Sequence, residues 1–221
     1  MSDSAENNNL ITMVDVGENL YGAERKKSKS VFIRTLIIGL CVIILLFSEA
    51  LFITLYTGIY IVDGSMLPTL TGADSPNVKG GDYIYINTHV KPNYGDIVVV
   101  YNPNTTTSGI DKLIKRVVAF GGDYVELKEG VLYVNGIEVK ESYVSEDNNS
   151  PLIHKNTYAK RKVANGCMFL LGDNRTGSVD SREFGDIPMN MLVGVVPDWS
   201  MRNKSVSTAF YTFFHFTIFG N

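Results

Sequence analysis

Three short segments of this sequence carry residue types that could do chemistry. The first is the stretch Asp63–Thr69, in which Ser65 follows a glycine and precedes a Pro-Thr turn. A hydroxyl held on an exposed turn is a weak nucleophile until a base removes its proton. An ordinary turn serine would have the same surroundings, so this stretch alone leaves both interpretations open.

A lysine in the second segment is the candidate base. The three histidines of the chain stand singly, which gives little support to a Ser-His-Asp arrangement. Lys115 lies in the apolar run 113–118, and burial among apolar groups lowers a lysine pKa from its reference value of about 10.4. Strand alternation would aim one of Lys115 and Arg116 inward and the other outward. The alternative is an edge strand with two solvated cations.

The third segment, Leu171–Gly185, is densely polar between apolar stretches. Buried hydrogen bonds are therefore expected in it. Asp180 and Arg182 could form an ion pair, and Ser178 could exchange a hydrogen bond with a lysine amine. A solvated loop is the alternative for any single piece of this segment.

In this order, the three segments resemble the signature boxes of type I signal peptidases, the Ser–Lys family that removes signal peptides. Gly95–Val98 resembles another box of that family. The resemblance implies Ser65 as the nucleophile and Lys115 as the general base. A lysine at 115, where the endoplasmic-reticulum branch has histidine, points to the bacterial type.

The resemblance also implies supporting residues. Ser178 would orient the lysine, and Asp180 with Arg182 would form a structural ion pair that holds the loop. Asp173 and Arg175 would give further support to the site. The shallow substrate pockets for small residues would be lined by Ile61, Met66, Leu113 and Ile114.

Asp63 departs from the family pattern. Some bacterial members have a serine at this position, whose hydroxyl supplies an oxyanion-hole donor, and an ionised carboxylate cannot donate. The Ser65 backbone N–H remains as a donor, and a neighbouring group or protonation of Asp63 could compensate. The alternative is a membrane-anchored, catalytically impaired homologue that binds substrates or precursors.

An apolar segment precedes the three candidate catalytic segments in the chain. Val31–Tyr60 is almost continuously apolar and follows a cluster of Lys and Arg at 25–29, and a transmembrane helix needs about 20 such residues. We expect one transmembrane helix over about 34–57, with the N-terminus cytoplasmic because positive charge stays inside. The predicted parts are a cytoplasmic tail at 1–30, mobile over 1–22, a transmembrane anchor at 31–58 and an extracytoplasmic catalytic β domain at 59–221.

The rest of the chain predicts a mainly β fold, an antiparallel ectodomain of the signal-peptidase type. Two turns, Glu129-Gly130 and Asn135-Gly136, are typical of hairpins, and 141–162 reads as a looser insertion. The Phe-rich segment 209–219 predicts either a final core strand or a segment lying on the membrane surface. Expected strands are 82–87, 96–101, 113–120, 124–128, 131–134, 137–139, 167–171 and 192–196.

Composition narrows the function class. The 221 residues include 45% hydrophobic residues and have a net charge of −3, which gives no reason to expect nucleic acid as a partner. Two cysteines and scattered histidines predict neither a disulfide nor a metal site. We expect a membrane-bound serine endopeptidase without cofactor, single-pass in the cell membrane, that cuts signal peptides of exported pre-proteins after small residues and contacts the lipid bilayer. A self-cleaving repressor-type peptidase and a peptidase dedicated to few substrates are the other candidates.

Overall fold

The computed structural model describes residues 3–74, 79–104, 111–145 and 157–218. Its contacts divide the chain into two compact units, Met1–Thr54 and Leu55–Asn221.

The first unit consists of one helix. Helix α1 covers Asp3–Leu55, and its part Lys29–Leu55, with 27 residues and a mean hydropathy of 2.8, is long and apolar enough to cross a membrane. This fits the predicted anchor, although the helix ends two residues before the expected end at 57. The segment 1–22, predicted as a mobile tail, is helical from Asp3 onward. Extending a helix that already exists costs far less than starting one, and no proline interrupts this segment.

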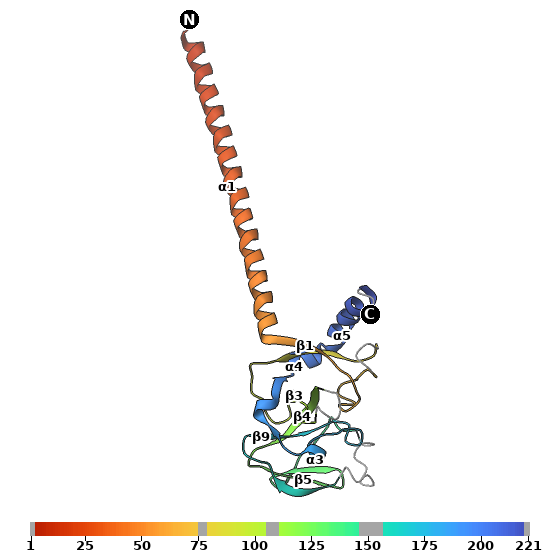
Figure 1. Cartoon of the computed structure of the whole chain (residues 1–221). Coiled ribbons are helices and arrows are strands. Elements are labelled where there is room, and N and C mark those ends of the chain that lie inside the picture. Colours follow the sequence, from red (N-terminus) through yellow and green to blue (C-terminus); the bar gives the residue numbers. More distant parts are fainter. Residues whose placement is uncertain (1–2, 75–78, 105–110, 146–156, 219–221) are drawn as a thin grey trace. The chain divides into compact units, whose positions relative to one another are not determined.

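The second unit contains two antiparallel sheets (Figure 1). The larger sheet has seven strands in the order β1 (Tyr56–Tyr60), β2 (Tyr83–Asn87), β11 (Leu192–Val195), β3 (Ile97–Tyr101), β4 (Lys112–Phe120), β9 (Cys167–Leu171) and β10 (Ile187–Pro188). The smaller sheet has four, in the order β7 (Ile137–Glu138), β6 (Val131–Val134), β5 (Tyr124–Lys128) and β8 (Tyr158–Lys162).

The predicted antiparallel β fold is confirmed, and all eight expected strands form within two residues of their predicted bounds. Three further strands were not predicted. Strand β1 continues the apolar run of α1 without a polar break, so the sequence gives no sign of the change from helix to strand. Strand β8 is rich in Lys and Arg because it is an edge strand, where long charged side chains reach solvent.

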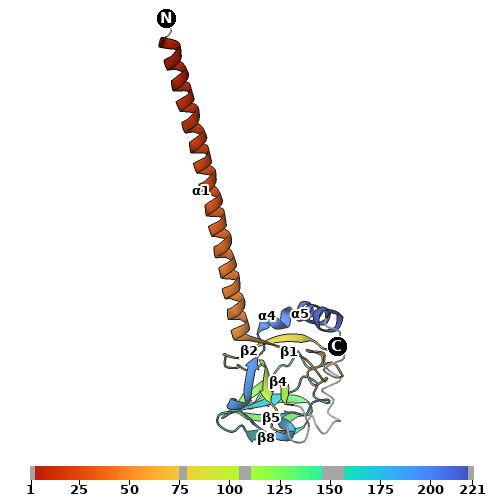
Figure 2. The same ribbon diagram turned by 45° about the horizontal axis from the view of Figure 1, so that its top comes forward.

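The C-terminal segment is helical, so the expectation of a final core strand was wrong. It forms α4 (Asp198–Arg202), α5 (Lys204–Thr212) and a π-helical turn, η4 (Phe213–Ile218). Strand β11 pairs with β2 only at its end, Val195 opposite Asn87. Hydroxyls from the helices satisfy the open edge instead: Tyr83 N–H donates to Thr208 Oγ1 and Tyr85 N–H to Ser200 Oγ, each over 2.7 Å. Figure 2 shows α4 and α5 lying along β1 and β2.

The described part of the unit also contains two shorter helices, α3 (Ser181–Phe184) and the 3₁₀ turn η3 (Met189–Met191). Helix α3 begins after the polar segment 172–180, which joins it to β9. Asp180 caps this helix, accepting the Arg182 N–H over 3.2 Å. The polar segment is thus fixed at both ends by regular structure.

Candidate active site

Strand β4 carries the candidate base into the interior. It lies between β3 and β9, and Lys115 stands opposite Val98. Because apolar strands flank it on both sides, Lys115 is only 1% exposed. The prediction of a buried lysine in an apolar strand is confirmed.

Arg116, the neighbour of Lys115, is buried as well, which corrects the expectation that one of the pair points to solvent. Its guanidinium makes two hydrogen bonds to Asp173, of 2.8 and 2.6 Å, and lies 3.8 Å from the ring centre of Tyr143. A buried cation needs such partners to offset its loss of hydration. Sequence reasoning missed this role of Arg116, because its partners lie 27 and 57 residues further along the chain.

The hydroxyl of Ser65 meets the amine of Lys115. Lys115 Nζ lies 2.8 Å from Ser65 Oγ and donates a hydrogen bond to the Ile114 carbonyl over 2.9 Å. Ser65 is 5% exposed. The structure therefore brings the two predicted catalytic residues, 50 positions apart in sequence, into direct contact.

The polar segment after β9 holds the turn that carries Ser65. Asn174 N–H donates to the Ser65 carbonyl over 3.0 Å, and its side-chain amide donates to the Gly64 carbonyl over 2.9 Å. Gly172 packs so closely that an added Cβ would lie 2.5 Å from the Ser65 carbonyl oxygen. Asn174 was not predicted as a site residue, although it lies inside the polar segment that was singled out.

Three buried guanidinium groups around the site each have a carboxylate partner. The predicted pair of Arg182 and Asp180 is present at 2.7 Å. The two predicted supporting residues have partners that the sequence did not reveal: Asp173 pairs with Arg116 at 2.6 Å, and Arg175 with Glu141 at 2.5 Å. Asp173 also accepts a hydrogen bond from Thr69 Oγ1 over 2.5 Å, which ties it to the nucleophile turn.

Lys115 differs from these guanidinium groups, since it forms no ion pair with any residue that the structure describes. Burial lowers the pKa of its amine below the ordinary value of 10.5. The more distant charges of Asp63, Asp180 and Asp173 raise that pKa, and Arg182 lowers it, but burial outweighs them. The amine is thus biased toward its neutral form, as a base requires.

Ser178 lies inside the site, 1% exposed, but it does not form the predicted hydrogen bond to the lysine. Its hydroxyl has no hydrogen-bond partner among the described residues. The Ile114 carbonyl and Ser65 hydroxyl occupy Lys115 Nζ instead. Ser178 Oγ packs against Gly172, where an added Cβ would lie 2.2 Å from it.

Asp63 accepts the backbone N–H of Ser65 through Oδ1, over 2.7 Å. This corrects the expectation that the Ser65 N–H remains open as a donor. The carboxylate side chain two residues before the nucleophile bends back onto the turn, as Asp side chains commonly do.

The structure brings together three of the four predicted substrate residues. Ile61, Met66 and Ile114 belong to one buried cluster beneath the nucleophile turn. Leu113 packs against a separate cluster with Val98 and Val100, because neighbouring residues of β4 point to opposite faces.

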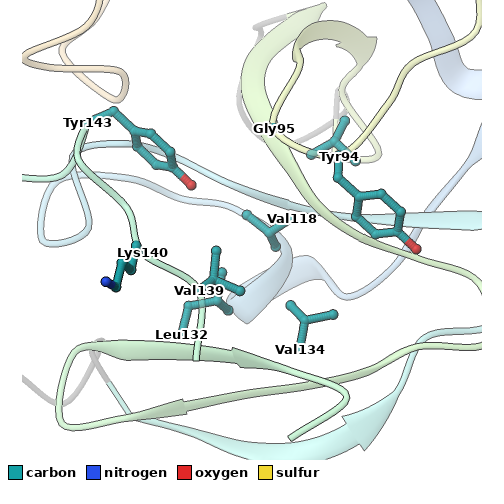
Figure 3. Close-up of a pocket in the computed structure, with 9 residues that line it drawn as sticks. Tyr94, Gly95, Val118, Leu132, Val134, Val139, Lys140 and Tyr143 are labelled. Atoms are coloured by element: carbon teal, nitrogen blue, oxygen red, sulfur yellow. The ribbon is translucent and has the colours of Figure 1, made fainter. Parts of the chain in front are cut away.

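A cavity of about 390 Å³ lies apart from the Ser65–Lys115 contact (Figure 3). It is lined by β4 and β6 and by the tyrosines Tyr94 and Tyr143, and neither Ser65 nor Lys115 reaches it. In the described part of the chain no three His, Cys, Asp or Glu side chains gather as metal ligands would.

Comparisons with known proteins define the class of this fold and site. The model of the family described as "Signal peptidase, peptidase S26" matches residues 33–199. The chain belongs to this family, and it is therefore a serine peptidase.

The proteins that are similar to this chain have the names of peptidases. It is 33% identical over 150 residues to signal peptidase I of Bacillus caldolyticus, covering 62% of this chain and 75% of that protein. It is 35% identical over 137 residues to thylakoidal processing peptidase 1 of Arabidopsis thaliana, covering 59% of this chain and 37% of that protein. Among solved structures, a signal peptidase I of Enterococcus faecalis V583 is similar at 28% identity, with a TM-score of 0.40, over 49% of this chain and 98% of that one.

Proposed function

We propose that this protein is a membrane-bound endopeptidase that cleaves signal peptides from exported pre-proteins after small residues, with Ser65 as nucleophile and Lys115 as general base. One observation carries the proposal: a buried amine without an ion-pair partner among the described residues lies 2.8 Å from the Ser65 hydroxyl. Family membership supports the substrate class.

The chemistry follows from that contact. Neutral Lys115 accepts the Ser65 hydroxyl proton while Oγ attacks the carbonyl carbon of the scissile peptide bond. The resulting ammonium returns the proton to the departing amine, which leaves the acyl group as an ester on Ser65. Neutral Lys115 then takes a proton from water, the hydroxide attacks the ester, and the proton returns to Ser65 Oγ as the acid product leaves.

The surrounding residues hold this geometry. Asn174 fixes the turn of Ser65 through two hydrogen bonds, and the Ile114 carbonyl orients the amine. The three guanidinium–carboxylate pairs compensate the remaining buried charges, and burial outweighs the effect that Asp180 and Asp173 still have on the pKa of Lys115.

The chemical proposal is tested with the purified full-length chain in detergent micelles and a pre-protein that carries a signal peptide. Mass spectrometry of the products should locate one cut after a small residue, and Ser65→Ala and Lys115→Ala should each leave the pre-protein uncut. Binding of the pre-protein without any cut by the wild-type chain would support the impaired-homologue alternative instead. Circular dichroism of the variants checks that the fold is retained.

We extend the proposal to the membrane. The apolar helix fits a single-pass anchor, and the Lys and Arg residues before it favour a cytoplasmic N-terminus and an extracytoplasmic catalytic unit. The C-terminal helices support a second contact with lipid. Their exposed apolar side chains are Val206, Phe210, Phe213 and Phe214, and exposed aromatic side chains are favoured at the lipid interface.

The second unit begins at Leu55, the last residue of the apolar helix. The next residue, Tyr56, packs edge-on against Trp199 of α4, with 5.2 Å between ring centres. The α4–α5 segment therefore lies at the point where the chain enters this unit, and Figures 1 and 2 both show the four-stranded sheet at its opposite end.

The membrane contact is tested by fluorescence. Trp199 is the only tryptophan of the chain, so Phe210→Trp in a Trp199→Phe background gives a single probe on α5. In vesicles of brominated phosphatidylcholine its emission should be quenched. A matched probe, Ile137→Trp, on the exposed β7 of the four-stranded sheet should not be quenched. Equal quenching of the two probes would contradict the proposed contact.

A further inference from the structure

We propose that Asp63 is a positioning residue that caps the Ser65 N–H in the free enzyme and is displaced from it by the carbonyl oxygen of the substrate. This inference rests on the proposed function, because it assigns Asp63 a role in the reaction of Ser65. It starts from the hydrogen bond of 2.7 Å between Ser65 N–H and Asp63 Oδ1.

The backbone of Asp63 is held firmly while its side chain is exposed. Its φ is +81°, a left-handed conformation that Asp tolerates better than most residues. Its N–H donates to the Ala73 carbonyl over 3.1 Å. Gly72 approaches so closely that an added Cβ would lie 1.6 Å from the Asp63 carbonyl oxygen. A rotation of the side chain is therefore the way in which this carboxylate can leave the N–H.

The capped N–H is one that the reaction needs. The tetrahedral intermediate of acyl transfer carries a negative oxygen that backbone N–H donors stabilise, and the nucleophile's own N–H commonly serves as one of them. A carboxylate on this N–H excludes that oxygen and repels its charge. Turnover therefore requires the Asp63 carboxylate to move away.

The same movement acts on the base. The charged groups that act on the Lys115 amine are Asp63, Asp180, Asp173 and Arg182. Asp180 and Asp173 each pair with a guanidinium, whereas Asp63 forms no ion pair in the described part of the chain. Its uncompensated charge favours the ammonium form of Lys115. Displacement of Asp63 therefore has two effects at once: it frees the Ser65 N–H as a donor, and it shifts Lys115 toward the neutral amine.

A plain structural role makes a different prediction. If Asp63 only stabilises the turn and its charge plays no part at Lys115, Asp63→Asn should behave as the wild type, because the amide oxygen can accept the same N–H. If Asp63 is the proposed cap, loss of its charge should matter even though the turn is kept.

The test is a titration of Lys115 in the full-length chain in micelles, followed by ¹³C NMR of the lysine side chain without substrate. In Asp63→Asn the titration should move to lower pH by about one pH unit. The acid limb of kcat/KM for the signal-peptide substrate should move by the same amount, which raises the rate on that limb about tenfold. Asp198→Asn, an exposed carboxylate on α4, is the matched control and should change neither.

An unchanged Lys115 titration in Asp63→Asn overturns the inference. The titration needs no turnover, so its failure is distinguishable from a failure of the proposed function, which would appear as an uncut pre-protein with the wild-type chain. A second measurement uses the wild type alone, in case the variant does not fold. The amide resonance of Ser65 should shift when a non-hydrolysable analogue of the signal-peptide substrate binds, because its carbonyl oxygen replaces the Asp63 carboxylate on this N–H. A Ser65 amide that does not respond to the bound analogue also overturns the inference.

Discussion

The two sheets of the second unit, Leu55–Asn221, bury different kinds of side chain. The seven-stranded sheet buries Lys115 and Arg116 on its β4 strand, next to the buried Asp173 and Asp180. The described strands of the four-stranded sheet bury apolar side chains, such as Val125, Leu127 and Leu132. Their charged residues lie at the surface or are half-buried.

This difference separates buried side chains that the stability of the fold explains from buried side chains that it does not explain. Burying a charge costs free energy that an apolar side chain would not cost. The four-stranded sheet carries no such cost and can be explained by packing. The seven-stranded sheet carries several buried charges, and concentrated buried charge with a shifted pKa is typical of a functional site.

The largest effect is expected from Lys115→Met, which keeps most of the length of the side chain and removes the base. Turnover of a signal-peptide substrate should fall by about 10³-fold or more, measured by product formation under single-turnover conditions. A variant with more than a tenth of wild-type turnover would exclude Lys115 as the base.

Lys115→Met should also change how stability depends on pH. Because burial lowers the pKa of Lys115 in the folded state, the unfolded state binds more protons between that pKa and the ordinary value. Wild-type stability should therefore rise with pH in this window. The variant should lack this rise and be the more stable of the two below the window, as measured by urea unfolding at several pH values. If the free energies of unfolding of the two proteins changed with pH in parallel, this prediction would be contradicted.

Asp173→Ala should give the next largest effect. It leaves the Arg116 guanidinium buried without its partner and removes the acceptor of Thr69. Unpairing a buried ion pair costs about 3–5 kcal/mol in the free energy of unfolding. Urea unfolding checks this, and a loss below about 1 kcal/mol would show that Arg116 readily finds water.

Leu127→Ala tests the four-stranded sheet. Leu127 is 1% exposed in the apolar cluster, and such truncations cost about 2–5 kcal/mol. The pH profile of kcat/KM should stay unchanged in the folded fraction, because no charge near Lys115 is altered. A shifted profile would mean that the two sheets do not divide packing and chemistry as described.

Lys128→Ala should have the smallest effect. Its ion pair with Glu126 spans 3.1 Å at the surface, with the lysine side chain 60% exposed. Exposed pairs contribute about 0–1 kcal/mol, so the urea midpoint should hardly move. A clear destabilisation would show that surface charge also matters to this sheet.

Most strands could be predicted because alternation and turn residues are local signals. The turn at Asn135-Gly136, for example, lies between β6 and β7 as expected. The C-terminal helices could not be predicted, because their position depends on the open edge of β2, far away in the chain. Strand β1 was missed because an apolar run has the same appearance in a membrane helix and in a strand.

For the site, the residue types in the three segments left alternatives open, and the resemblance of these segments to the signature boxes of type I signal peptidases assigned roles to Ser65, Lys115 and the pair of Asp180 with Arg182. The structure contains the Ser65–Lys115 contact and this ion pair. Which groups those side chains contact was decided by tertiary structure alone. Asp63 on the Ser65 N–H, Glu141 on Arg175 and the Ile114 carbonyl on Lys115 depend on the directions of side chains in the folded chain. A hydrogen bond is directional and short, and residue order does not specify its partner.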